Sequence, residues 1–135
     1  MPNLNMNNGP YALNNEEVRR RVEANRKGNY AFCAYKDDGL LYIFYVGRSD
    51  TDLQAEIIAR SADFPQLTHF MFSYASSVKE AYEKECKNYH DCGGNINLYN
   101  KIHPDRPDGA SYHCPVCGHP ITNYTDIFKT LTYLK

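Results

Sequence analysis

Two segments rich in aromatic and β-branched residues lie in the middle of the chain, at residues 30–35 and 40–46. The short connection between them, Lys-Asp-Asp-Gly, ends in the Asp-Gly pair that is typical of tight hairpin turns. This pattern predicts an antiparallel hairpin. Residues 67–74, with the sequence Leu-Thr-His-Phe-Met-Phe-Ser-Tyr, are the best candidate for a third strand.

Helix signals occur before the hairpin and again between the hairpin and the third strand. Asn15 can cap the first helix and Gly28 can end it. Asp50 or Thr51 can cap the second helix, which we expect to end before Pro65. The apolar residues of the second helix recur at helical spacing: Leu53, Ile57 and Ile58. Helices and strands are therefore expected to alternate along this part of the chain.

A third predicted helix follows the third strand. Ser77 and Glu80 have the spacing of a capping box, and we expect the helix to run to about His90. At 100° per residue, Glu85 lies within about 20° of Val78 on the helical wheel. The pattern thus places a carboxylate at the centre of the apolar face of this helix.

The predicted burial of Glu85 favours a metal-binding or catalytic role. A carboxylate directed toward a core costs several kcal/mol unless it is paired or coordinates a metal ion. Two alternatives remain open. The helix can be rotated so that Glu85 reaches solvent, or Glu85 can pair with Arg48 or Arg60.

Composition limits the chain to one domain with appendages, because its 135 residues, 42% of them hydrophobic, can bury a single core. We expect a flexible tail over residues 1–14, the domain over residues 15–100, and a cysteine-rich loop with a C-terminal helix over residues 101–135. The net charge of −1 excludes a protein that coats nucleic acid non-specifically. No signal peptide or membrane-spanning run is evident, which predicts a soluble, cytoplasmic protein without a membrane partner.

Three motifs stand out along the chain: Gly28-Asn29-Tyr30, Tyr45-Val46-Gly47, and Glu85 four residues after Ala81. Together they resemble the GIY-YIG nuclease superfamily. The segment Gly28-Asn29-Tyr30 is similar to the first motif of that family, and Tyr45-Val46-Gly47 is similar to the second. Glu85, four residues after Ala81, is similar to the glutamate of the family's metal-binding helix. The resemblance covers roughly residues 28–100, and the order and spacing of the predicted elements match as well as the motifs.

The resemblance implies an α/β fold of the α+β kind, with a small three-stranded antiparallel sheet flanked by helices. It also implies hydrolysis of a DNA phosphodiester with one divalent ion. Glu85 would hold Mg²⁺, which polarises the scissile phosphate and stabilises the leaving oxygen. Tyr30 and Tyr45 would face each other near the attacking water, one of them as general base or as its hydrogen-bond partner.

The second predicted helix departs from the family pattern. Active members carry an arginine eight or nine residues after the glycine of the second motif, where this chain has Ala55 and Glu56. Arg48, directly after the motif, or Arg60, one turn further along the helix, could supply the guanidinium instead. A degenerate site is the other interpretation. The family's asparagine beyond the metal helix corresponds to Asn95 or Asn97, and spacing does not choose between them.

A second metal site is predicted at Cys114-Pro-Val-Cys117, which has the form of a zinc knuckle. The odd number of cysteines, five, argues against a disulfide framework and favours metal binding. We favour His90 and Cys92 as the remaining ligands of a structural zinc ion. The other candidates are Cys86, His103, His113 and His119, and Cys33 is interpreted as a core residue.

Three classes of function follow from these patterns. The first is a Mg²⁺-dependent DNA endonuclease of the GIY-YIG type, for which a protein partner would supply targeting. The second is a catalytically impaired relative that binds nucleic acid or protein. The third is a zinc-containing interaction protein that shares only the fold.

Apolar residues at helical spacing near the C-terminus predict a short packing helix: Ile127, Phe128, Leu131 and Leu134.

Overall fold

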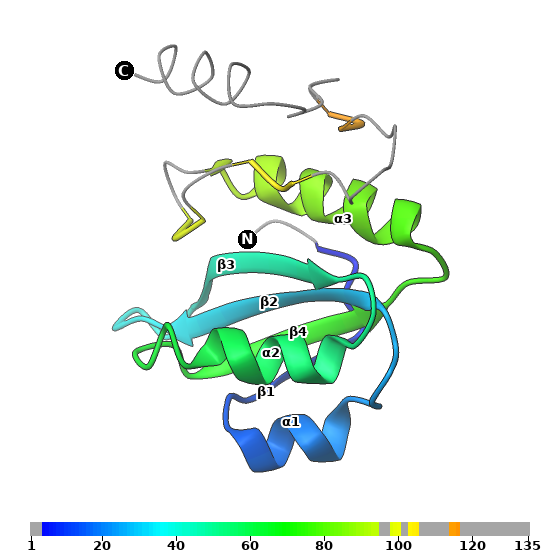
Figure 1. Ribbon diagram of the computed structural model, residues 1–135. Coiled ribbons are helices and arrows are strands. Elements are labelled where there is room, and N and C mark those ends of the chain that lie inside the picture. Colours follow the sequence, from blue (N-terminus) through cyan, green and yellow to red (C-terminus); the bar gives the residue numbers. More distant parts are fainter. Residues whose placement is uncertain (1–3, 95–97, 101–102, 106–113, 117–135) are drawn as a thin grey trace.

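The computed structural model describes residues 4–94, 98–100, 103–105 and 114–116. The described elements follow one another along the chain as β1 (Asn8–Ala12), α1 (Asn15–Arg21), β2 (Gly28–Tyr35), β3 (Leu41–Ser49), α2 (Leu53–Ser61), β4 (His69–Tyr74) and α3 (Val78–Asp91). The described part is an α+β domain in which a small antiparallel sheet is flanked by three helices (Figure 1). The predicted C-terminal helix lies outside the described residues.

The sheet has the strand order β1-β4-β2-β3, and each neighbouring pair is antiparallel. The predicted hairpin is confirmed, because β2 pairs with β3 from Gly28 opposite Ser49 to Tyr35 opposite Leu41. The third predicted strand is also present as β4, which begins at His69 and pairs with the other edge of β2. β2 is therefore the central strand on which both halves of the sheet are built.

The sheet has a fourth strand where the sequence pattern predicted a tail. β1 pairs with β4, with Tyr11 opposite Phe70 and Ala12 opposite His69, so the expectation of a flexible segment is wrong for residues 8–12. The ring of Tyr11 packs 5.8 Å from the ring of Phe70. A five-residue strand with Gly9-Pro10 inside it is too short and too irregular to show the two-residue alternation of apolar and polar positions. The strand forms because β4 offers it an unpaired edge.

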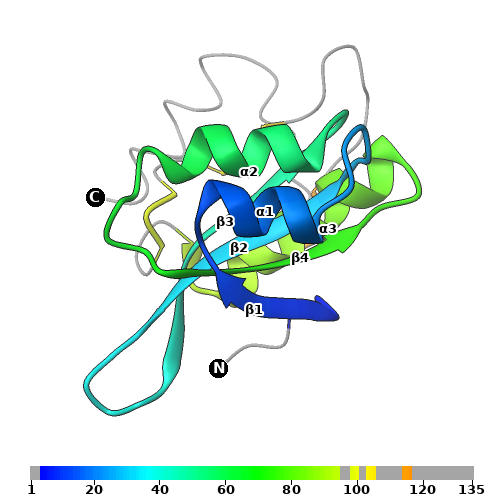
Figure 2. The ribbon, with the colours of Figure 1, turned by 90° about the horizontal axis from the view of Figure 1, so that it is seen from below.

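Helices cover both faces of the sheet. α1 and α2 lie against one face and α3 lies against the other, as the two views in Figure 1 and Figure 2 show. Alternate residues of β2 enter the two cores: Tyr30 and Phe32 pack with α1 and α2, whereas Ala31 and Cys33 pack in the core that contains Tyr89 of α3. The sheet is thus the middle layer of three.

The helix ends differ from the expected positions at two places. The side chain of Asn14, rather than Asn15, accepts from the backbone N–H of Glu17, and α1 stops at Arg21 instead of continuing toward Gly28. α2 is capped by Asp52, not by Asp50 or Thr51. The Ser77 cap of α3 is confirmed by its hydrogen bond from the Glu80 N–H.

Candidate functional site

The residues of the three sequence motifs meet at a small hollow where β2 begins and β3 ends. The hollow has a volume of about 230 Å³. It is lined by residues of β2, β3, α2 and α3, of the loop after β3, and of the segment 103–105. These residues are Tyr30, Tyr45, Gly47, Arg48, Asp50, Glu56, Glu85 and Asp105. We call this group the motif hollow. Four of the predicted site residues, Tyr30, Tyr45, Arg48 and Glu85, are thus brought together from three separate elements.

The two motif glycines are explained by the close approach of neighbouring residues, and Gly47 also lines the hollow. A Cβ at Gly28 would overlap the carbonyl oxygen of Ser73 on β4 and would lie 2.9 Å from Leu53 Cδ2. A Cβ at Gly47 would lie 2.5 Å from the hydroxyl of Tyr30. Each glycine therefore allows a neighbouring strand or ring to approach closer than any larger residue permits.

Tyr30 is fully buried, and its hydroxyl donates a 2.9 Å hydrogen bond to Glu56 Oε2. Its ring centroid lies 6.1 Å from that of Tyr45, with an angle of 28° between the planes. Burial raises the pKa of Tyr30 well above its usual value, and the nearby Tyr45 and Glu56 raise it further. Burial also raises the pKa of Tyr45, although Arg60 opposes this effect. Tyr30 is therefore a hydrogen-bond donor in this arrangement.

Glu85 is buried, with 8% of its surface exposed, which confirms its predicted place on the apolar face of α3. Arg48 Nη1 donates a 2.5 Å hydrogen bond to Glu85 Oε1, and Arg48 Nε donates to Asp50 Oδ1 at 2.9 Å. Desolvation raises the pKa of Glu85 to about 7, although Arg48 opposes the shift and Asp50 adds to it. Of the alternatives open from the sequence, the structure shows the ion pair with Arg48.

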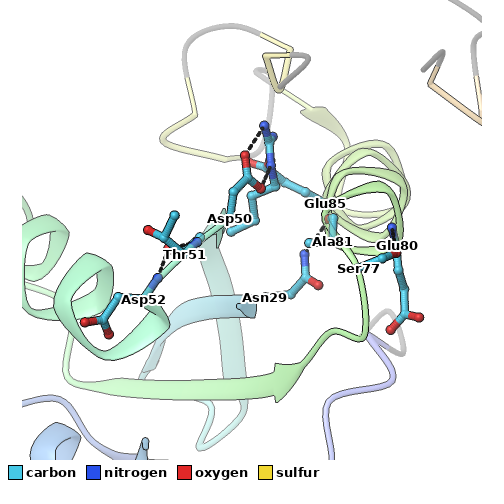
Figure 3. Close-up of polar contacts among 10 residues, drawn as sticks. Asn29, Asp50, Thr51, Asp52, Ser77, Glu80, Ala81 and Glu85 are labelled. Carbon is cyan, nitrogen blue, oxygen red and sulfur yellow. Dashed lines mark hydrogen bonds and ion pairs between the residues drawn. The ribbon is translucent and has the colours of Figure 1, made fainter. Parts of the chain in front are cut away.

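The position of α3 over β2 is set by Asn29, the middle residue of the first motif. Its side-chain amide donates a 2.9 Å hydrogen bond to the carbonyl oxygen of Ala81, one turn before Glu85 (Figure 3). Because Asn29 is fully buried, this bond stabilises one defined rotation of the helix. The first and third motifs are therefore in direct contact.

Arg60 lies beside the motif hollow rather than in it. Its Nη1 donates to Asp63 Oδ2 at 2.9 Å, and its Nε lies 3.6 Å from Glu56 Oε2. With Tyr45, Glu85 and Asp105, Arg60 lines an adjoining hollow of about 350 Å³. The two candidate arginines thus flank Tyr45 and Glu85 from different elements.

Three acidic residues of the motif hollow were not predicted as site residues: Asp50, Glu56 and Asp105. Asp50 could have been suspected because it is two residues after Arg48, and Glu56 because it stands where the family pattern has arginine. No sequence signal pointed to Asp105, which reaches the hollow only through the fold. Four carboxyl groups, including that of Glu85, line the hollow with a single arginine, a donor set that suits a hard divalent cation.

Asn95 and Asn97, the two candidates for the family's asparagine, lie outside the described residues. Asn100 instead contacts the second motif. Its side chain accepts from the Val46 N–H at 3.0 Å and donates to the Val46 carbonyl at 2.7 Å. This pair of bonds ties the segment after α3 to the end of β3.

The predicted zinc ligand set is not the one that the fold assembles. Cys114 lies with Cys86 and His103, whose ligand atoms are all within 4.8 Å of one another, whereas Cys92 packs in the core that contains Cys33. Positions 86 and 92 are about 240° apart on a helix, so the two thiols face different sides of α3. Among the described residues Cys92 is therefore not grouped with Cys114, whereas the ring of His90 lies 5.0 Å from that of His103. Cys117 lies outside them.

No protein-family model, curated protein or solved structure matches this chain. Within the described residues, no helix is both long enough and apolar enough to cross a bilayer.

Proposed function

We propose that this chain is a divalent-cation-dependent phosphodiesterase that cleaves DNA, of the GIY-YIG type that its motifs resemble. One observation carries the proposal: Tyr30, Tyr45, Arg48 and Glu85 line a single hollow although they come from three elements. The sequence motifs give each of these residues a role in the same chemistry. Their convergence supports a shared role better than it supports four unrelated structural roles.

The acidic residues of the motif hollow fit a magnesium ion. Glu85 would be the principal ligand, and Asp50 and Asp105 line the same hollow. A bound Mg²⁺ would polarise the phosphate and stabilise the leaving oxygen. In the ion pair, Arg48 Nη1 donates to Oε1 of Glu85. The other carboxylate oxygen, Oε2, would then be the one that binds the ion.

Arg48 and the Tyr30–Glu56 pair supply the remaining chemistry. Arg48 is positioned by two carboxylates at the wall of the hollow, where its guanidinium can also donate to a phosphate oxygen. Tyr30 keeps its proton and orients Glu56 through their hydrogen bond. Glu56 is therefore a better proton acceptor for an attacking water than the Tyr30 phenol.

The test is cleavage of supercoiled plasmid and of a branched DNA substrate with Mg²⁺ or Mn²⁺. Wild type should nick both substrates, and Glu85→Gln should reduce the rate by about 100-fold or more. Glu83→Gln is the matched control, because it makes the same change on α3 outside the motif hollow and should leave the rate unchanged. Equal cleavage by wild type and Glu85→Gln, or none by folded wild type with either ion, would contradict the proposal.

A second candidate function is DNA or protein binding without cleavage. Glu56 at the position of the expected arginine favours it, as does the engagement of Arg48 by two carboxylates. The two candidates separate when cleavage and binding are measured on the same preparation. Salt-dependent binding of a labelled duplex with no cleavage would favour the binding module.

A further inference from the structure

Two buried cysteines and one buried histidine meet beside α3, on residues that no part of the proposed chemistry uses. The ligand atoms of Cys86, His103 and Cys114 lie within 4.8 Å of one another. Two thiolates held 2.3 Å from one ion in tetrahedral geometry would be about 3.8 Å apart. The group is therefore close to the dimensions of a metal site before any adjustment of side chains.

We infer that Cys86, His103 and Cys114 bind a zinc ion, and that this ion fastens the segment carrying Asp105 to α3. Two sulfur ligands and one imidazole are a donor set that selects zinc over magnesium or calcium. Burial of all three residues suits a closed structural site.

The surroundings of His103 also fit a metal ligand. Its Nδ1 lies 2.9 Å from the carbonyl oxygen of Pro104. A proton on Nδ1 that is donated to this carbonyl leaves the lone pair on Nε2, which is the tautomer that a metal needs. The ring is also packed against the rings of Tyr89 and His90, at centroid distances of 5.6 and 5.0 Å. These contacts hold the imidazole in place.

The site and the motif hollow are built from neighbouring residues of the same two segments. Cys86 follows Glu85 in α3, and His103 is two residues before Asp105, which lines the hollow with Glu85. An ion that joins Cys86 to His103 would therefore hold Asp105 near Glu85. Asn100, through its bonds to Val46, is a second tie on the same segment.

The first experiment measures the metal content of the full chain, purified under reducing conditions from zinc-supplemented cells. Mass spectrometry of the native protein should show one zinc ion per chain. Cys86→Ser, His103→Ala and Cys114→Ser should each lose most of it. Cys33→Ser and Cys92→Ser are matched controls, since these buried cysteines lie in a different core cluster and should retain the ion.

A second measurement needs no substitution and so does not depend on the folding of variants. Wild type in which Co²⁺ replaces zinc should show the visible absorption of a tetrahedral thiolate site. Iodoacetamide should modify Cys86 and Cys114 more slowly before chelation than after it, as read by peptide mass spectrometry. The inference is overturned if the reduced wild type neither contains nor takes up zinc, or if Cys92→Ser loses zinc while Cys86→Ser keeps it. All of these readouts are independent of DNA cleavage.

Discussion

Arg48 and Glu85 meet between β3 and α3, where the guanidinium donates to the carboxylate across 2.5 Å and each side chain is only 11% exposed. This pair explains how α3 can carry a carboxylate at the centre of its apolar face. Without a partner, desolvation of Glu85 would be largely uncompensated. Because desolvation still raises the pKa of Glu85 to about 7, the pairing offsets that cost only in part.

Arg48→Met should destabilise the domain, because it leaves Glu85 buried without its partner. The expected loss in the free energy of unfolding is about 3 kcal/mol, measured by urea denaturation at neutral pH without divalent cations. The double variant Arg48→Met/Glu85→Gln should recover part of this loss, because position 85 is then neutral. The recovery is partial because Asp50, whose side chain is 31% exposed, also loses its bond to Arg48. Arg20→Met, at a side chain that is 70% exposed, is the control and should change stability by less than about 0.5 kcal/mol. A loss as small as that of the control would show that the pair carries no stability.

Gly47→Ala should be destabilising, because the added methyl group would overlap the ring of Tyr30. Overpacking of this kind costs about 1–3 kcal/mol. The same substitution should cost about 1 kcal/mol less in a Tyr30→Leu background, where the ring that meets the methyl group is gone. Denaturation of the four proteins in this cycle measures the coupling. Strictly additive effects would mean that the backbone, and not the Tyr30 ring, opposes a side chain at position 47.

Asn100→Ala should cost about 3 kcal/mol, because it removes two hydrogen bonds and leaves the N–H and carbonyl of Val46 without their partner. Asn100→Asp should not restore stability, since a carboxylate cannot donate to the Val46 carbonyl. Thermal unfolding followed by circular dichroism measures both variants. Thr51→Ala, at an exposed position in the loop after β3, is the control and should stay within about 0.5 kcal/mol of wild type. Full stability of Asn100→Asp would argue that only the bond from the Val46 N–H matters.

The cap of α3 should make stability depend on pH. Hydrogen bonds from Ser76 to Glu80 hold the pKa of this carboxyl below its usual value of 4.5. The folded chain then binds the proton less well than the unfolded chain. The contribution of Glu80 to the free energy of unfolding is therefore fully present above the pKa of the unfolded state and is lost as the pH falls through the pKa of the folded state.

The stability of wild type minus that of Glu80→Gln should therefore be positive at pH 7, by less than about 1 kcal/mol, and should be smaller at pH 3. Paired thermal denaturation curves at the two pH values give this difference. Glu83→Gln removes a charge from the same helix without a capping role and should show a smaller change between the two pH values. A difference for Glu80→Gln that does not depend on pH would contradict the assignment.

Local patterns in the sequence predicted the elements that have a clear period or a clear cap. The Asp-Gly turn predicted the hairpin of β2 and β3, the Ser77 cap predicted the start of α3, and helical spacing predicted the burial of Glu85. β1 was missed because its stability comes from the edge of β4 and not from its own sequence. The predicted end of α1 was wrong because Val22, which leaves the helix, is buried in the core beside Val18.

The sequence by itself determined the candidate site residues: two tyrosines, a buried glutamate, two nearby arginines and a cysteine pair. Only the tertiary structure decided their partners. It joined Arg48 to Glu85, brought Asp105 to the same hollow, and placed Cys114 with Cys86 and His103 instead of Cys92. The physical reason is that the direction of a side chain on one element follows from a local repeat, which is 100° per residue in a helix and two residues in a strand. The distance between two elements depends on how all of them pack, and no spacing within one segment encodes that distance.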